Sequence, residues 1–169
     1  MINTNDIFIT ESNMIFGPFS SEKLYHIEKS SAYNDLGEGF RSIEFVYMQN
    51  EKLLFIEAKP SSPRPTVENT LRFDDFIDEI TTKFYDAFQL FLAVFLCRRT
   101  NDGMGAIIRE CSYAETKLIF CLIIHGHKVE WLPPIQDTVR RRMAKHNKLW
   151  EIEFIAINDD IARSMKMIA

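Results

Sequence analysis

Residues 42–59 have the sequence SIEFVYMQNEKLLFIEAK, in which two apolar segments flank Asn50-Glu51. Phe, Val, Ile and Tyr are enriched in strands, and a short polar pair between two such segments is typical of a hairpin turn. Side chains alternate between the two faces of a strand. If the turn centres on Asn50-Glu51, Glu44 lies opposite Glu57 on one face of the hairpin.

Two opposed carboxylates are unusual, because directly paired residues in a hairpin have Cβ atoms only about 4.5–5.5 Å apart. Like charges repel at that distance, and a divalent cation between them reverses the sign of the interaction. Oxygen ligands of this kind suit Mg²⁺. The alternative is a solvated hairpin face, with Lys59 in a loose ion pair with Glu57 or Glu44. The strongly apolar neighbours of both glutamates favour the metal site, and Ser42, expected opposite Lys59, could donate a hydrogen bond within it.

At these positions the chain resembles the PD-(D/E)XK nuclease superfamily, whose fold is called restriction-endonuclease-like. The signature of that superfamily is an acidic residue on one strand and an acid-x-Lys triplet on the next, after an apolar run. Here the first acid is Glu44 and the triplet is Glu57-Ala58-Lys59. The chain departs from the pattern in two places, because the first acid is usually Asp and the residue before it, here Ile43, is usually Pro.

The resemblance implies a metal-dependent endonuclease that uses Mg²⁺ or Mn²⁺ to hydrolyse nucleic acid, DNA rather than RNA. The implied metal ligands are Glu44, Glu57 and the backbone carbonyl of Ala58. The implied role of Lys59 is to position or deprotonate the attacking water, or to neutralise the transition state. The same superfamily includes members that have lost the chemistry and act as binding or assembly modules, which is the alternative. A third interpretation is an unrelated α/β binding protein.

Several members of the superfamily carry an accessory acid on an N-terminal helix. In this chain a helix is predicted from Ser20 or Ser21 to about Asn34, because these serines are suitable N-caps and apolar residues such as Ile27 follow at helical spacing. Glu28 is the candidate accessory acid on that helix. A solvated helix face is the alternative for its side chain.

The other elements follow from hydrophobic spacing and from turn residues. We expect short strands at 7–10 and 14–16, hairpin strands at about 40–48 and 52–59, a long helix from Asp74 or Asp75 to about Arg99, a buried strand at 117–125, a helix from Pro133 to about Leu149, a strand at 152–157 and a terminal helix capped by Asn158 or Asp159. The predicted fold is a single α/β domain over residues 1–169, with a restriction-endonuclease-like mixed sheet flanked by helices. Its core covers about residues 14–125, and a C-terminal helix-strand-helix is extra.

The most basic stretch of the chain is RRRMAKHNK, residues 140–148. Arg140, Arg141, Arg142 and Lys145 are candidates for binding a phosphate backbone. The alternative is a solvated helix ridge, since cations near a helix C-terminus also interact favourably with its dipole. The net charge of −4 and the pI of about 5.6 weigh against an extensive nucleic-acid surface.

Three cysteines form no CxxC motif, and Cys97 and Cys121 are expected to be buried thiols in a reducing compartment. His125 and His127 lack an evident third ligand, so we do not expect a zinc site there. The first residues lack the basic and apolar regions of a signal peptide, and no apolar run approaches the roughly 18 residues of a membrane span. These features predict a cytoplasmic protein without a membrane segment. They leave its oligomeric state open.

Overall fold

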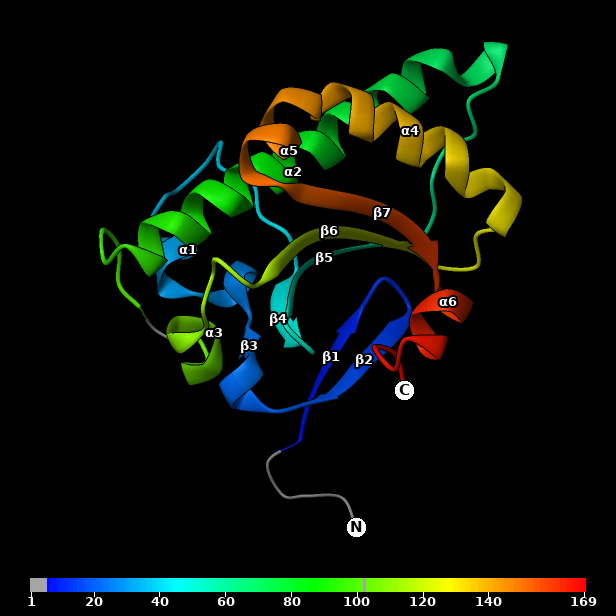
Figure 1. The fold of residues 1–169 in the computed structure, drawn as a ribbon. Helices are drawn as coiled ribbons and strands as arrows, with labels where there is room; N and C mark the ends of the chain where they lie inside the picture. The colour runs from blue at the N-terminus through cyan, green and yellow to red at the C-terminus, as the bar shows by residue number, and fades with distance from the viewer. Residues whose placement is uncertain (1–5, 102) are drawn as a thin grey trace.

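Five strands form one mixed sheet in the order β3-β4-β5-β6-β7 (Figure 1). They are β3 (Leu24–Tyr25), β4 (Phe45–Gln49), β5 (Lys52–Lys59), β6 (Lys117–Ile124) and β7 (Ile152–Asn158). The pairs β3–β4 and β4–β5 are antiparallel, whereas β5–β6 and β6–β7 are parallel. The computed structural model, which describes residues 6–101 and 103–169, therefore has a single α/β domain, as the sequence predicts.

The register of the β4–β5 hairpin is the predicted one. Phe45 pairs with Ile56 and Gln49 with Lys52, so the turn centres on Asn50-Glu51. Both turn residues have positive φ, at 47° and 59°. A two-residue turn with positive φ at both positions matches the twist of the flanking strands, which fixes the register.

The crossover from β5 to β6 contains the long helix α2 (Thr70–Phe95), preceded by the short 3₁₀ helix η3 (Val67–Asn69) and followed by α3 (Ala106–Glu110). The predicted bounds of the long helix were wrong at both ends. It begins at Thr70, because the 3₁₀ turn leads directly into helical geometry ahead of the expected aspartate cap. It ends at Phe95, because Cys97 takes a left-handed conformation with φ 56°. Cys97 is consequently exposed and not buried as expected, whereas Cys121 is buried.

Two layers cover the sheet (Figure 1). On one face lie α2, α4 (Leu132–Arg142) and α5 (Ala144–Trp150), with a core in which Phe84 and Phe88 of α2 pack against Phe55 and Phe120 of the sheet. The other face is covered by the hairpin of β1 (Ile7–Glu11) and β2 (Met14–Phe19) and by α6 (Asp159–Ser164). Strand β6 is buried on both faces, as its continuous apolar sequence predicts.

The N-terminal helix predicted from Ser20 or Ser21 to Asn34 is wrong. This segment forms the 3₁₀ helix η1 (Ser21–Lys23), the edge strand β3, the 3₁₀ helix η2 (Ile27–Lys29) and the single-turn α1 (Ser31–Asn34). Leu24 and Tyr25 pair with Tyr47 and Val46 at the edge of the sheet. The apolar residues that mimicked a helical stripe are buried, but by sheet pairing, which outweighs a weak local propensity.

The C-terminal helices and strand follow the prediction, with the expected helix divided at Met143 into α4 and α5. Asn158 caps α6, since its side chain accepts a hydrogen bond from the backbone N–H of Ile161 at 3.0 Å. Another 3₁₀ helix, η4 (Val129–Trp131), leads into α4. Within the described residues, no helix is long and apolar enough to cross a membrane.

Candidate active site

The hairpin places Glu44 and Glu57 together on the face of the sheet that α2 covers. The ladder ends at the pair Phe45–Ile56, and the backbone N–H of Glu44, the residue before β4, donates to the carbonyl of the same Ile56 at 3.0 Å, so direct pairing of Glu44 with Glu57 stays a prediction. Glu57 is fully buried, and Glu44 is only 6% exposed. A solvated hairpin face is therefore excluded for both carboxylates.

Two lysines contact the carboxylate of Glu57. The Lys83 Nζ lies 2.7 Å from Glu57 Oε1, and the Lys59 Nζ lies 3.3 Å from the same oxygen. Lys59 also pairs with Glu79 of α2. Lys59 was predicted at this site, whereas Lys83 was missed. Its signal in the sequence is a cation on the apolar face of α2, three residues after the buried Ile80 and four before the buried Ala87.

A second group of acids meets at Glu44. One carboxylate oxygen from each of Glu11, Glu28 and Glu44 lies within 4.8 Å of the others. Glu28 was the candidate accessory acid, and it reaches the site from η2 rather than from a helix. Glu11 was missed, because it ends β1 far from the hairpin in sequence, beside the turn to β2.

Burial and repulsion together disturb the protonation of these groups. The pKa of Glu44 is raised to about 9, first by burial, then by a hydrogen bond with Glu28 and by the charges of Glu57, Glu28 and Glu11. Burial also raises the pKa of Glu57, and the ammonium groups of Lys83 and Lys59 oppose that rise. Burial acts to lower the pKa of Lys83, but Glu57, Glu44 and Glu28 outweigh it and raise the pKa overall. At neutral pH, Glu44 therefore holds a proton that a cation could replace.

Two buried carboxylate oxygens favour a cation at this site. Oε2 of Glu44 and Oε2 of Glu57 have no hydrogen-bond partner among the described residues. A buried acceptor without a partner costs roughly 1–3 kcal/mol of stability, and more when it is charged. The donor set consists of hard carboxylate oxygens, which suit Mg²⁺ or Mn²⁺.

The protonation of Glu44 predicts a dependence of stability on pH. Because the folded-state pKa of about 9 lies above the usual 4.5, the folded protein keeps this proton where the unfolded chain loses it. The contribution of this proton to the free energy of unfolding is therefore complete below about pH 4.5 and is lost as the pH rises towards 9. We expect Glu44→Gln, which mimics the protonated acid, to flatten this decline in chelator and to be more stable at pH 8 by roughly 1–3 kcal/mol.

Urea denaturation at several pH values between about 5 and 9 measures this effect. Glu22→Gln is the matched control, because Glu22 is exposed in η1 and lies outside the cluster. Parallel pH profiles for wild type and Glu44→Gln would contradict the assigned protonation.

The structure gives less support to the roles expected for Ser42 and Ala58. The ladder stops before it reaches Ser42, whose buried hydroxyl donates to the carbonyl of Ile43 at 3.1 Å, so the expected pairing with Lys59 does not form. The side chain of Ala58 packs in the core on the opposite face of the sheet, as strand alternation requires. Metal coordination by the Ala58 carbonyl stays a prediction.

The basic stretch is mostly engaged elsewhere. The Arg140 Nε donates to the carbonyl of Phe154 at 2.9 Å, and Arg142 pairs with Asp78 and, at 3.6 Å, with Asp74. Arg141 makes a long contact of 3.5 Å with Thr138, and Lys145 is exposed. Among the described residues, none of these four cations forms an ion pair with Glu44 or Glu57.

Comparisons of the chain with models of protein families, with curated proteins and with solved structures gave no match. Carboxylates in this arrangement can hold a divalent cation, and the two lysines can bind or neutralise an anionic ligand.

Proposed function

We propose that this protein is a Mg²⁺- or Mn²⁺-dependent nuclease that hydrolyses phosphodiester bonds of nucleic acid. The observation that carries the proposal is the convergence of four glutamates, Glu11, Glu28, Glu44 and Glu57, with Lys59 at one end of the hairpin. The resemblance of Glu44 and the triplet Glu57-Ala58-Lys59 to PD-(D/E)XK nucleases supports it. So does the strand order, an antiparallel hairpin followed by a helical crossover to a parallel strand.

The residues present fit a divalent cation. Glu11, Glu28 and Glu44 would hold it, with Glu57 and the Ala58 carbonyl on the adjacent strand as further ligands. Glu44 and Glu57 each contribute a buried oxygen that lacks a partner among the described residues. When bound, such a cation lowers the pKa of a coordinated water and stabilises negative charge on phosphate oxygens.

Lys59 lies where the buried acids meet solvent. It ends β5 and lines an open cavity of about 510 Å³, together with Pro60, Ser61, Pro63, Arg72, Asp75, Phe76 and Glu79. A phosphate that enters this cavity reaches the Lys59 ammonium at the edge of the carboxylate cluster. In the proposed reaction Lys59 leaves its ion pair with Glu79 and contacts the substrate instead. There it either orients the attacking water or neutralises the negative charge that develops on the phosphate. Lys83 remains behind Glu57 and holds its carboxylate in place.

The alternative is a catalytically inactive nuclease-fold domain that serves as a binding or assembly module. The observation in its favour is that Lys83 and Lys59 already neutralise Glu57, at 2.7 and 3.3 Å. If these ion pairs persist, Glu57 requires no metal.

Metal binding tests the proposal at the first step. We expect Mn²⁺ to bind wild type in calorimetry and to raise its melting temperature, since a ligand at 100 times its Kd stabilises a protein by about 2.7 kcal/mol. Glu44→Gln removes the carboxylate that faces both Glu57 and the other acids, so we expect at least about tenfold weaker binding.

Glu22→Gln is the control, because it removes the same charge at an exposed position outside the cluster. Equal Mn²⁺ affinity in wild type, Glu44→Gln and Glu22→Gln would remove the support for a metal site at the hairpin.

A further inference from the structure

Three nitrogen-bearing side chains surround the indole of Trp131, in the 3₁₀ helix η4. The guanidinium carbon of Arg64 lies 4.3 Å from the ring centroid and the Lys128 Nζ lies 5.0 Å from it. The ring of His127 meets the indole edge-on, with centroids 5.3 Å apart. Cation–π contacts of this kind hold Arg64 and Lys128 beside an aromatic face.

The two cations on Trp131 are not neutralised by acids. Neither Arg64 nor Lys128 forms a salt bridge within residues 6–101 and 103–169, and both are exposed. By contrast, Arg142 of the basic stretch is paired with two aspartates. The Trp131 surface, meaning Arg64, Lys128 and Trp131, therefore carries two cations on a chain whose net charge is −4.

One chain segment connects the Trp131 surface to the cavity at Lys59. Residues 60–65 leave the end of β5 and run beside the start of α4 (Figure 1). Ser61 and Pro63 line the cavity. The alternate residues face the indole side: the Ser62 Oγ is 3.3 Å from His127 Nε2, and Arg64 lies over Trp131. The two features are thus opposite sides of the same short segment.

We propose that the Trp131 surface binds single-stranded nucleic acid, with a base stacked on the indole and the adjoining phosphates on Arg64 and Lys128. The strand then continues over residues 60–65 towards Lys59. A base takes the place of a cation on the indole, and the released cation pairs with phosphate. The indole and the cation each exchange one favourable contact for another. Base–aromatic stacking requires an exposed base face, which a single strand offers and a stacked duplex does not. The cleavage that follows rests on the proposed function, whereas the binding does not.

Fluorescence tests the binding directly, because the chain has two tryptophans, Trp131 and Trp150. In Trp150→Phe, Trp131 is the sole reporter, and we expect oligothymidylate added in EDTA to quench its emission. In Trp131→Phe, Trp150 is the reporter and should not respond. Anisotropy of a labelled oligothymidylate should show about tenfold or greater loss of affinity in Trp131→Phe and in Arg64→Ala.

Two controls make the result specific. Lys117→Ala removes an exposed cation at the start of β6, outside the Trp131 surface, and is expected to leave affinity unchanged. A duplex of equal length is expected to bind more weakly than the single strand. Affinity that is equal in Trp131→Phe, Arg64→Ala and wild type, or equal for duplex and single strand, would overturn the inference.

The two proposals fail separately. Metal-dependent cleavage with no effect of Trp131→Phe on binding would overturn the Trp131 surface and leave the nuclease intact. Quenching by oligothymidylate in a protein that never cleaves would support the Trp131 surface and overturn the nuclease.

Discussion

Lys59→Ala is expected to reduce metal-dependent cleavage of an oligonucleotide by about 100-fold or more, while Mn²⁺ binding persists. The size follows from the loss of a positioned charge that acts on the transition state, for which single-group deletions cost about 10²–10³ in rate. An ammonium is not a metal ligand, so the carboxylate cluster keeps its oxygens. Since Lys59 contributes positive charge 3.3 Å from Glu57, its removal should leave Mn²⁺ affinity unchanged or tighter.

The matched control for this experiment is Lys52→Ala. Lys52 begins the same strand that Lys59 ends, and it is exposed and distant from the carboxylates in the ladder. Single-stranded DNA, duplex DNA and RNA should each be tested with Mg²⁺, with Mn²⁺ and with chelator. Cleavage that survives in Lys59→Ala would place the activity in another site or in a contaminant. No cleavage by wild type on any substrate would favour the inactive binding module.

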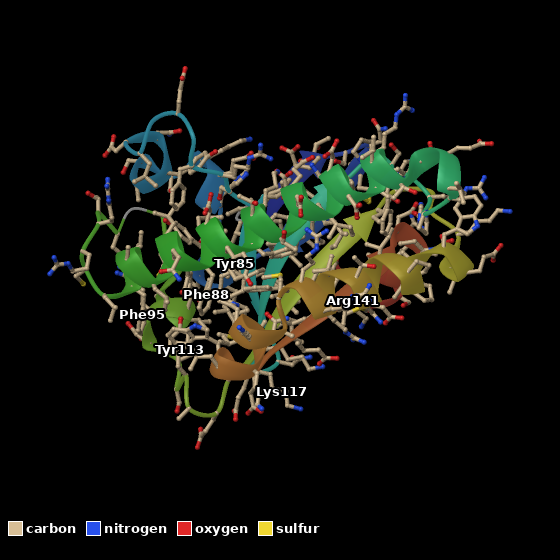
Figure 2. All side chains as sticks on the ribbon, turned by 90° about the horizontal axis from the view of Figure 1, so that it is seen from above. Tyr85, Phe88, Phe95, Tyr113, Lys117 and Arg141 are labelled. Atoms are coloured by element: carbon tan, nitrogen blue, oxygen red, sulfur yellow. The ribbon has the colours of Figure 1, made fainter. Side chains whose placement is uncertain are left out.

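Phe88→Ala is expected to lower the free energy of unfolding by about 3–5 kcal/mol, the usual range for a buried phenylalanine. Phe88 is 1% exposed and packs its ring against Phe55, Phe120 and Trp150, with centroid distances of 5.7, 5.8 and 5.1 Å. Figure 2 labels Phe88 on α2, along which it lies between Tyr85 and Phe95. The loss of one ring at this junction disrupts contacts from α2, the sheet and α5 together.

The expected loss is measured by urea denaturation, with Phe8→Ala as the control. Phe8 is the same residue type but is 49% exposed in β1, so its truncation should cost less than about 1 kcal/mol. Phe88 also borders an apolar cavity of about 370 Å³ with Phe95 and Tyr113, which lie near one another at the end of α2 in Figure 2. A near-neutral effect of Phe88→Ala would mean that α2 is not packed on the sheet as described.

The hairpin, the long helix and the buried strand could be predicted because their patterns are local. In residues 42–59, alternation with period 2 and a two-residue turn leave one register in which the apolar side chains stay buried. The expected opposition of Glu44 and Glu57 lies just beyond the last pair of that register, Phe45–Ile56. In α2 the phenylalanines recur at helical spacing, and in β6 a continuous apolar run is long enough for a strand covered on both faces.

The segment before the hairpin could not be predicted in this way. Leu24, Tyr25 and Ile27 fit a helical stripe, yet the edge of β4 offered Leu24 and Tyr25 backbone partners and burial that a surface helix does not provide. An edge strand of two residues leaves almost no alternation to detect. The pairing of β3 with β4 decided the structure there, because it provides hydrogen-bond partners for backbone groups on the edge of β4 that faces away from β5.

The same distinction holds for the candidate site. Local pattern placed Glu44, Glu57 and Lys59 on one hairpin, since Glu44 directly precedes β4 and the other two belong to β5. Folding alone brought in Glu11 from β1, Glu28 from η2 and Lys83 from α2, three elements that no local rule connects to the end of β5. Burial under α2 then raised the pKa of Glu44 to about 9 and left carboxylate oxygens without partners among the described residues. Charge and desolvation depend on distances through space, and those distances exist only once the layers have packed.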